Sequence, residues 1–191
     1  MLRIVRRGIL GGTFDPPHLA HLLAGEAAYR ELALDVVTFI PAGAPWQKAG
    51  SAVSPPGDRW SMTQLAVEGI GYFEADDREI IRPGWTYTAD TLATFPDDED
   101  LVLVLGSDAA SRIGSWERSG EVLARATIAV APRPAAGPVA AGSGPHHLLS
   151  MPGMPISGTM IRERRRAGRS IRFLVPEPVW GFIDSRGLYE S

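Results

Sequence analysis

The run Leu101–Leu105 is apolar at every position, and it constrains the fold more than any other part of this sequence. A strand with one wet face alternates apolar and polar residues, whereas an unbroken apolar run is typical of a strand covered on both faces in a parallel sheet. Short β-rich runs alternate with helical patterns along the rest of the chain, as in βαβ units. We expect strands at Ile4–Leu10, Val36–Ile40, Glu79–Ile81, Leu101–Leu105, Thr127–Ala131 and His147–Leu149, and helices near His18–Leu32, Asp58–Gly71, Thr88–Thr94 and Ser111–Ala124. Because such crossovers are nearly always right-handed, the sequence predicts an α/β protein with a Rossmann-like three-layer αβα fold and a mainly parallel central sheet.

The size and charge of the chain narrow its function. Its 191 residues suit a single domain, residues 1–191, with a substantial core. The net charge of −3 argues against a general binder of nucleic acid or of anionic membranes. No run approaches the roughly 18 apolar residues that span a bilayer, and there is no cysteine for disulfides or thiol catalysis. We therefore expect a cytoplasmic protein, and its oligomeric state stays open, a homo-oligomer included.

A glycine pair and two histidines follow the first expected strand, in the segment Gly11–His21. Glycines have no Cβ and let the backbone approach a ligand closely. A helix that begins near Pro16 turns its N–H groups and the positive end of its dipole toward the same place. His18 and His21 are three residues apart, so they share one helical face. This arrangement indicates a phosphate cradle, which we interpret as a nucleotide triphosphate site.

Plainer interpretations of this segment compete with that one. Asp15 followed by two prolines is also an ordinary helix start, with Asp as the N-cap. Two histidines at this spacing could bind a metal, but the chain has only 4 His and no Cys to complete a set, so we expect no protein-held metal. The sequence also lacks a GxxxxGK[ST] loop and a GxGxxG motif after a strand. No covalent nucleophile is evident, which favours direct displacement at phosphorus by positioning and charge stabilisation.

A second candidate phosphate site lies near the other end of the chain, at Ile156–Arg162. Ser157 and Thr159 can cap the start of a helix, which alone would be a structural role. The same helix N-terminus can receive phosphate, with Arg162 adding a forked, charged donor. Lys48, after the second expected strand, is a further candidate for charge compensation, with Mg²⁺ arriving on the triphosphate.

These two segments resemble the paired motifs of one enzyme superfamily. Gly11–His21 reads GGTFDPPHLAH and resembles the GGxFDPxHxGH signature of the nucleotidyltransferases, with Ala20 in place of a glycine. Ile156–Arg162 resembles their ISxTxIR motif. The resemblance implies that the histidines, His18 and His21, stabilise the leaving pyrophosphate. It also implies an ATP site that includes Gly11, Gly12, Thr13, Phe14, Ile156, Ser157, Thr159 and Arg162.

The middle of the chain resembles one branch of that superfamily, the bacterial nicotinate mononucleotide adenylyltransferases. Asp77–Leu92 is similar to their DxExxRxGPSYTxDTL block, and Gly106–Trp116 is similar to their GxDxxxxxxxW stretch. The resemblance covers Gly11–Tyr189 in order, and it implies transfer of an adenylyl group from ATP to nicotinate mononucleotide (NaMN) in NAD biosynthesis. The products would be nicotinate adenine dinucleotide (NaAD) and pyrophosphate. The implied contacts are Gly106 and Asp108 to the nucleotide ribose, Thr86, Tyr87 and Thr88 to the nicotinate carboxylate, Trp116 to the pyridine ring, and Lys48 and Arg133 to the substrates.

One departure from the family pattern keeps alternatives open. Trp85 stands where the family usually has proline, beside the Tyr-Thr turn, and it can reshape the pyridine pocket. An adenylyltransferase that uses the amide NMN or another phosphate acceptor is therefore one alternative. A nucleotide-binding regulator without catalysis is another, although both motifs keep their polar residues. Trp116 and Tyr87 could also be ordinary packing side chains.

Overall fold

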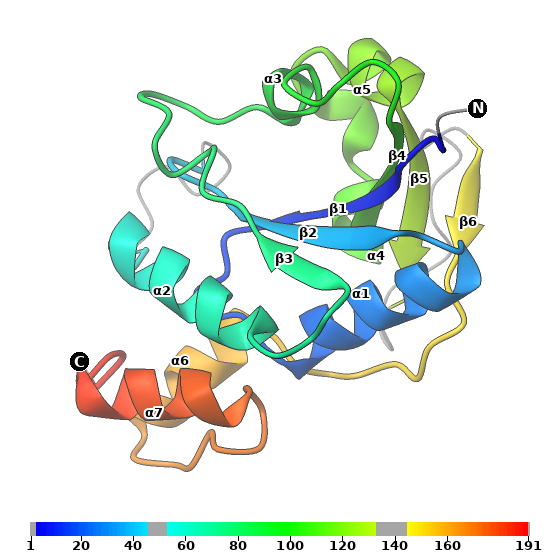
Figure 1. The fold of residues 1–191 in the computed structure, drawn as a ribbon. Coiled ribbons are helices and arrows are strands. Elements are labelled where there is room, and N and C mark those ends of the chain that lie inside the picture. Colours follow the sequence, from blue (N-terminus) through cyan, green and yellow to red (C-terminus); the bar gives the residue numbers. More distant parts are fainter. Residues whose placement is uncertain (1–2, 46–52, 133–144, 191) are drawn as a thin grey trace.

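The computed structural model describes residues 3–45, 53–132 and 145–190. Within these ranges, six parallel strands form one sheet in the order β3-β2-β1-β4-β5-β6 (Figure 1). The strands are β1 (Arg6–Gly12), β2 (Val36–Pro41), β3 (Phe73–Ala75), β4 (Asp100–Gly106), β5 (Ala126–Ala131) and β6 (His146–Leu148). The helices are α1 (Leu19–Glu31), α2 (Pro56–Val67), α3 (Thr88–Leu92), α4 (Ser107–Ala110), the 3-10 helix η2 (Ile113–Ser115), α5 (Ser119–Arg125), α6 (Gly158–Arg166) and α7 (Glu177–Ser185). This strand order confirms the predicted Rossmann-like α/β fold.

Helices cover both faces of the sheet, which explains the apolar run in β4. On one face, Ala28 of α1 packs in a core that includes Val102 and Val104 of β4. On the other face, α3, α4 and α5 pack in a core that includes Leu101, Leu103 and Leu105 (Figure 1). Every residue from Leu101 to Leu105 is buried. Successive side chains of β4 thus enter opposite cores, as expected for a central parallel strand.

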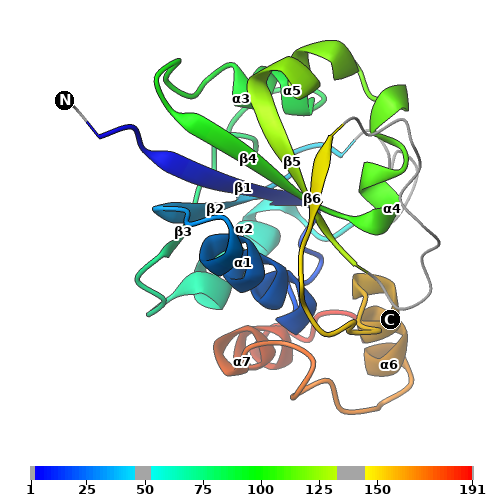
Figure 2. The same ribbon diagram turned by 90° about the vertical axis from the view of Figure 1, so that its right-hand side faces the viewer.

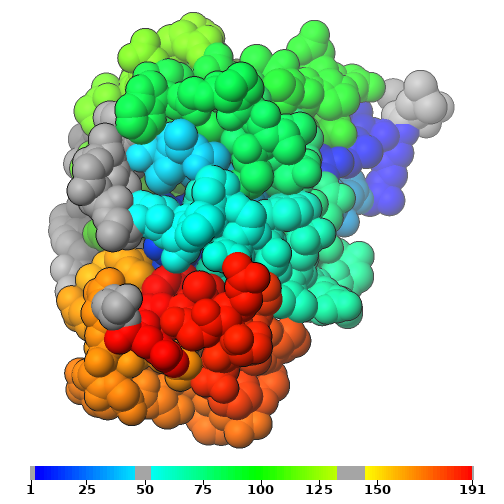
Figure 3. Space-filling model, turned by 90° about the vertical axis from the view of Figure 1, so that its left-hand side faces the viewer, coloured from blue at the N-terminus to red at the C-terminus, as the bar shows by residue number. Residues whose placement is uncertain are grey.

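A third apolar cluster joins the C-terminal helices to α2. Met62 of α2, Ile161 of α6, and Val179 and Ile183 of α7 are fully buried in it. Helix α7 and the residues after it, in red, lie against the cyan helix α2 in Figure 3, and Figure 2 shows α6 and α7 together beside the sheet. This cluster keeps the end of the chain close to the segment between β1 and α1.

Two of the expected elements are wrong. The third strand is Phe73–Ala75, and the expected strand at Glu79–Ile81 is a turn. The Phe73 ring is buried in the core, whereas the Ile81 side chain is 72% exposed, so burial selects the earlier segment. The expected helix Ser111–Ala124 is interrupted, because Arg118 adopts a left-handed backbone conformation with φ of 52° just before α5 begins.

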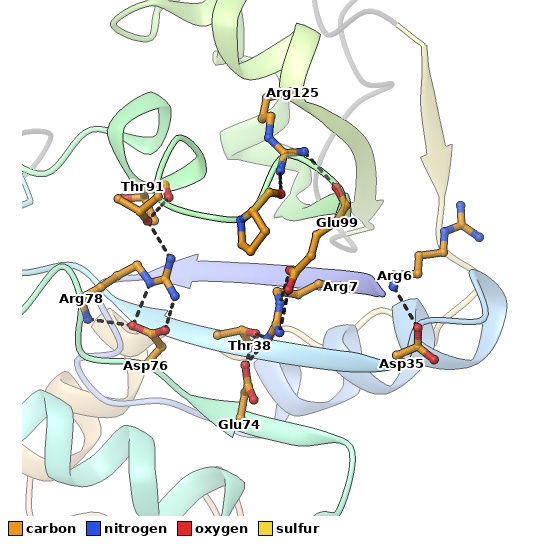
Figure 4. A network of polar contacts seen from close by, with 12 residues as sticks. Arg6, Arg7, Asp35, Thr38, Glu74, Asp76, Arg78, Thr91, Glu99 and Arg125 are labelled. Carbon is orange, nitrogen blue, oxygen red and sulfur yellow. Dashed lines mark hydrogen bonds and ion pairs between the residues drawn. The ribbon is translucent and has the colours of Figure 1, made fainter. Parts of the chain in front are cut away.

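A polar network ties β1, β2 and β3 together on the face covered by α3 (Figure 4). Arg7 of β1 donates hydrogen bonds to Glu99 at 2.7 Å and to the hydroxyl of Thr38 at 2.8 Å, and it pairs with Glu74 of β3. The fully buried Thr38 hydroxyl donates in turn to Glu74 at 2.7 Å. Burial alone would lower the pKa of Arg7, but the contacts with Glu99 and Glu74 raise it above its ordinary value. The network is therefore satisfied as a unit, with Thr38 at its centre.

We expect Thr38→Val to lower the free energy of unfolding by about 1–2 kcal/mol, because valine keeps the shape and removes a donor and an acceptor from a buried network. Urea unfolding measures the change. Thr127→Val, at a half-buried position of β5, is the matched control and should change stability by less than about 0.5 kcal/mol. Equal losses in the two variants would show that the Thr38 hydroxyl contributes nothing specific.

Candidate active site

A cavity of about 780 Å³ opens at the carboxyl edge of the sheet. The segments that follow β1, β2 and β4 all line it, as the sequence predicts, through residues that include Thr13, Ala42 and Asp108. Strand order reverses between β1 and β4, and a parallel α/β sheet binds its ligands at such a switch point.

The two histidines of the Gly-His motif stack on each other in the cavity wall. His18 is the N-cap residue of α1, and its ring lies 3.7 Å from the His21 ring, centroid to centroid. The backbone N–H of His18 donates to Nδ1 of His21 at 3.1 Å. A neutral imidazole whose Nδ1 accepts a hydrogen bond carries its proton on Nε2. The local fold therefore makes the Nε2–H of His21 a hydrogen-bond donor.

The backbone before the histidines approaches the cavity closely. Gly11, Gly12 and Thr13 line it, and a Cβ on Gly11 would meet nothing within 4 Å, so the ligand space begins at the backbone. Phe14 has a left-handed backbone with φ of 49°, and its ring is 2% exposed in the core. That ring meets the edge of His21 at 5.0 Å and is not among the residues that line the cavity. Phe14 thus supports His21 from behind.

The two motifs, far apart in the sequence, are in contact. Arg162 of α6 donates from Nη1 to the carbonyl oxygen of Asp15 at 2.7 Å, across a separation of 147 residues. A Cβ on Gly158, the first residue of α6, would lie 2.8 Å from that same carbonyl oxygen. Ile156 lines the cavity. The start of α6 therefore adjoins the Gly-His motif, as a shared ATP site requires.

Ser157 and Thr159 are engaged within α6. Ser157 accepts the N–H of Met160 at 3.2 Å, which confirms its capping role. Thr159 accepts a hydrogen bond from Nη2 of Arg162 at 3.3 Å. Neither is among the residues that line the cavity, so their side chains shape the start of α6 next to it.

Asp15 is held on a second side by the end of the chain. It is 5% exposed, and Tyr189 donates to its Oδ1 at 2.6 Å. Burial and the nearby Asp15 charge raise the pKa of Tyr189 far above its ordinary value, so the hydroxyl keeps its proton. Sequence reasoning gave Asp15 no more than a capping role and Tyr189 no individual role, although both lie within the segments that carry the resemblance.

The turn Thr86–Thr88, which we expect to bind the acceptor nucleotide, faces the same cavity. Thr86, Tyr87 and Thr88 line it at the start of α3, where Tyr87 is the N-cap. The backbone N–H of Thr86 is directed to the carbonyl oxygen of Ala44 at 3.4 Å, so this end of the turn lies against the loop after β2.

An aromatic ring and the end of β4 also line the cavity. Half-buried Trp116 lines it together with Gly106 and Asp108. Among the described residues, the buried indole N–H of Trp116 has no acceptor within hydrogen-bond distance. A donor of this kind suits a ligand oxygen.

Glu79 also lines the cavity, and sequence reasoning missed it because it was assigned to a strand. Its carboxylate accepts a hydrogen bond from the hydroxyl of Thr91 at 2.6 Å, and the polar side chain of Thr86 also favours its charged form. Burial raises the pKa of Glu79, and these two side chains oppose that shift only in part. A Cβ on Gly43 would lie 1.9 Å from the Glu79 carbonyl oxygen, so the loop after β2 packs directly against this segment. Glu79 therefore braces the turn that contains Thr86.

Two of the predicted site residues, Lys48 and Arg133, lie outside the described residues. Residues 3–45, 53–132 and 145–190 contain no group of three or more His, Cys, Asp or Glu side chains that could hold a metal ion. Over the same ranges, no helix is both long enough and apolar enough to cross a membrane.

Comparisons with known proteins identify the family and the fold of this chain. The model of the cytidylyltransferase-like family matches residues 9–164. The chain is 40% identical to a probable nicotinate-nucleotide adenylyltransferase of Desulfitobacterium hafniense (strain Y51), over 96% of this chain and 95% of the relative. It is 41% identical to one of the same name in Saccharopolyspora erythraea, over 100% of this chain and 92% of the relative. The Plasmodium falciparum nicotinic acid mononucleotide adenylyltransferase, solved with NaAD, shares the fold with a TM-score of 0.82 at 18% identity, over 97% of this chain and 98% of that one.

We expect Glu79→Gln to stabilise the protein more at pH 7 than at pH 4. A carboxyl group with a raised pKa in the folded state contributes most stability below its unfolded pKa, and that contribution is lost as the pH rises through the folded pKa. Glutamine does not titrate, so the difference in unfolding free energy between variant and wild type should grow from pH 4 to pH 7. Urea unfolding across this range measures it, with the exposed Glu68→Gln as control for the loss of a charge. A difference that stays constant or shrinks would contradict the assignment.

Proposed function

Because the chain belongs to the cytidylyltransferase-like family and, within it, to the nicotinate-nucleotide adenylyltransferases, we propose that it transfers the adenylyl group of ATP to NaMN, giving NaAD and pyrophosphate. One observation carries this proposal. A single cavity is lined both by the Gly-His motif and by the Thr86–Thr88 turn with Trp116. One wall of the cavity therefore suits ATP, the adenylyl donor, and another wall suits the acceptor nucleotide.

The proposed reaction is a direct displacement. A 5′-phosphate oxygen of NaMN attacks the α-phosphorus of ATP, the bond from that phosphorus to the bridging oxygen breaks, and pyrophosphate leaves. Such a step depends on positioning and on stabilisation of the charge that grows on the leaving group. His18 and His21 donate hydrogen bonds to the oxygens of the leaving pyrophosphate. The tautomer fixed by the His18 N–H makes Nε2 the donor of His21. Mg²⁺ accompanies ATP and neutralises part of the charge of its phosphates.

The ATP half of the site surrounds these histidines. Backbone groups of Gly11, Gly12 and Thr13 lie along the phosphates, and Phe14 supports them from the core. The start of α6 adjoins this half, with Ile156, Ser157, Thr159 and Arg162 as the residues that shape it. Gly106 and Asp108 lie by a nucleotide ribose. Lys48 is proposed to add positive charge.

The acceptor half binds the pyridine ring and its carboxylate. Trp116 stacks on the ring, and the N–H groups of Tyr87 and Thr88 receive the carboxylate, with Thr86 holding the turn against the loop after β2. We also propose that Arg133 contributes to substrate binding. Backbone N–H groups donate hydrogen bonds more favourably to a carboxylate than to a carboxamide, because the NH₂ of an amide is itself a donor. This chemistry favours NaMN over NMN.

We also propose that residues 1–191 act as one nucleotidyltransferase domain in the cytoplasm, where ATP is available. Its partners are the two small-molecule substrates, with no nucleic acid or membrane involved, and the net charge of −3 is consistent with that.

We expect pyrophosphate release with ATP, Mg²⁺ and NaMN, and kcat/KM for NMN at least about 10-fold lower, the size of a lost charge-assisted hydrogen bond. A coupled pyrophosphate assay with both acceptors in parallel measures the ratio. Equal rates would contradict the role of the Thr86–Thr88 turn. No release with either acceptor would contradict the proposed function and favour a binding protein.

We expect His18→Ala and His21→Ala each to lower kcat by about 10²–10³-fold, as removal of a donor to developing charge does elsewhere. His147→Ala, an exposed position of β6, is the matched control and should keep wild-type kcat. Thermal unfolding of all three variants checks that the fold is intact. Near-normal turnover in a folded His18→Ala or His21→Ala variant would remove that histidine from the reaction.

A further inference from the structure

Arg59, in the first turns of α2, is a buried cation whose hydrogen bonds go to backbone. It is 1% exposed. Its Nε donates to the carbonyl oxygen of Ser54 at 3.0 Å, and its Nη2 donates to that of Gly43 at 2.9 Å. Its Nη1 donates to two more carbonyls, those of Thr13 at 3.0 Å and of Ala42. The planar guanidinium fork has donors in several directions at once, which suits this arrangement.

The carbonyl acceptors of Arg59 lie on different walls of the cavity. Thr13 belongs to the segment after β1, next to the histidines, whereas Ala42 and Gly43 belong to the loop after β2. Thr13 and Ala42 both line the cavity. The N–H of Ala42 also donates to the carbonyl oxygen of Gly12 at 2.8 Å. Arg59 therefore fixes the spacing between these two loops from behind, without lining the cavity itself.

The loop after β2 reaches onward to the acceptor side. Gly43 packs against the backbone of Glu79 so closely that a Cβ there would lie 1.9 Å from its carbonyl oxygen. The N–H of Thr86 is directed to the carbonyl of Ala44 at 3.4 Å. Contacts thus run from the Gly-His motif through Arg59 and the β2 loop to the Thr86–Thr88 turn.

The charge of Arg59 is not explained by stability alone. Burial lowers its pKa, and the negative charge of Asp15 opposes that shift. Guanidinium remains protonated in proteins, so the charge has to be desolvated on folding. Apolar side chains of similar volume often replace buried charges without loss of stability. A requirement for fixed geometry between the loops accounts for an arginine at this position.

We infer that Arg59 is a positioning residue for adenylyl transfer, which holds the ATP half of the cavity at the correct distance and angle from the acceptor half. The inference rests on the proposed function. Displacement at phosphorus needs the attacking oxygen and the leaving group roughly in line, and a displacement of about 1 Å can cost about 10²-fold in rate. Each half is built from its own strand ends and helix starts, so each keeps its separate affinity when the spacing changes.

The test is Arg59→Lys, because lysine has a compact ammonium that cannot reach all of these carbonyls at once. We expect kcat for ATP and NaMN to fall about 100-fold. The dissociation constants of ATP alone and of NaMN alone, measured by titration calorimetry, should change less than about 3-fold, well under the tenfold that 1.4 kcal/mol represents. Retained kcat in the folded variant would overturn the inference. Weaker binding of ATP in parallel with the loss of kcat would also overturn it.

Arg125→Lys is the matched control. Arg125 also donates to backbone carbonyls, those of Glu99 at 3.1 Å and Pro96 at 2.6 Å, but it does so before β4, at the opposite edge of the sheet (Figure 4). Its variant should keep wild-type kcat whatever its stability. An equal fall of kcat in both variants would mean that loss of an arginine bound to backbone carbonyls acts through general stability, and it would overturn the inference.

Two further measurements distinguish a local effect of the Arg59 substitutions on the two loops from a loss of overall stability. Millimolar guanidinium should restore kcat of Arg59→Ala at least about 10-fold and leave Arg125→Ala unchanged, since the added ion can refill the site among the carbonyls. Hydrogen exchange of the loops after β1 and β2 should be faster in Arg59→Lys than in Arg125→Lys. Wild-type protein that forms no product from ATP and NaMN contradicts the proposed function. The exchange experiment still decides on Arg59, because unchanged exchange in both loops would overturn its role.

Discussion

The hydrogen bonds that hold Asp15 are the interactions on which the rest of the site depends. Its carbonyl oxygen accepts from Arg162 at 2.7 Å, and its carboxylate accepts from Tyr189 at 2.6 Å, so residues from the end of the chain hold a loop from its beginning. The backbone N–H of Ser54 reaches the same carboxylate at 3.3 Å. Apart from these contacts, α6 is placed by the ion pairs of Arg165 with Asp184 and Glu190 and by apolar packing against α2 and α7, which is non-directional. Asp15 therefore converts a hydrophobic association into a defined geometry beside the histidines.

The parallel sheet supplies the other half of that geometry. In the order β3-β2-β1-β4-β5-β6, the carboxyl ends of β1, β2 and β4 lie at one edge, and their following segments form one wall after another of the cavity. The helices that start there, α1 and α4, direct their N-terminal ends toward the space where phosphates and ribose are proposed to bind. Distance in sequence thus matters little, because the topology brings each motif to the same edge.

A feature of the fold or the site could be predicted from the sequence where its own residues and their spacing indicate it. The run Leu101–Leu105 shows its burial by its own composition, and the Gly-His motif combines glycines, prolines and histidines at helical spacing, so both could be interpreted alone. Arg59 and Glu79 have no such local signal. An arginine on a helix and a glutamate in a loop are usually solvated, and their burial depends on carbonyls and hydroxyls from segments that are not adjacent in sequence. The expected strand at Glu79–Ile81 failed for a related reason, since its β-like composition says nothing of the competing burial of Phe73.

The buried hydrogen-bond networks around Arg7 and Arg59 restrain different parts of the structure. Around Arg7, cations meet carboxylates and a hydroxyl, so side chains are tied to side chains across strands whose backbones are already fixed by the sheet. Around Arg59, the hydrogen-bond acceptors among the described residues are all backbone carbonyls, so the cation restrains the backbone of the loops after β1 and β2. A carboxylate partner for Arg59 would satisfy its charge and leave those loops unrestrained. A reaction between two bound nucleotides depends on the relative position of the loops, and hydrogen bonds to the backbone fix that position. Asp15 accordingly acts on Arg59 through its charge, and the Asp15 carboxylate accepts a hydrogen bond from Tyr189.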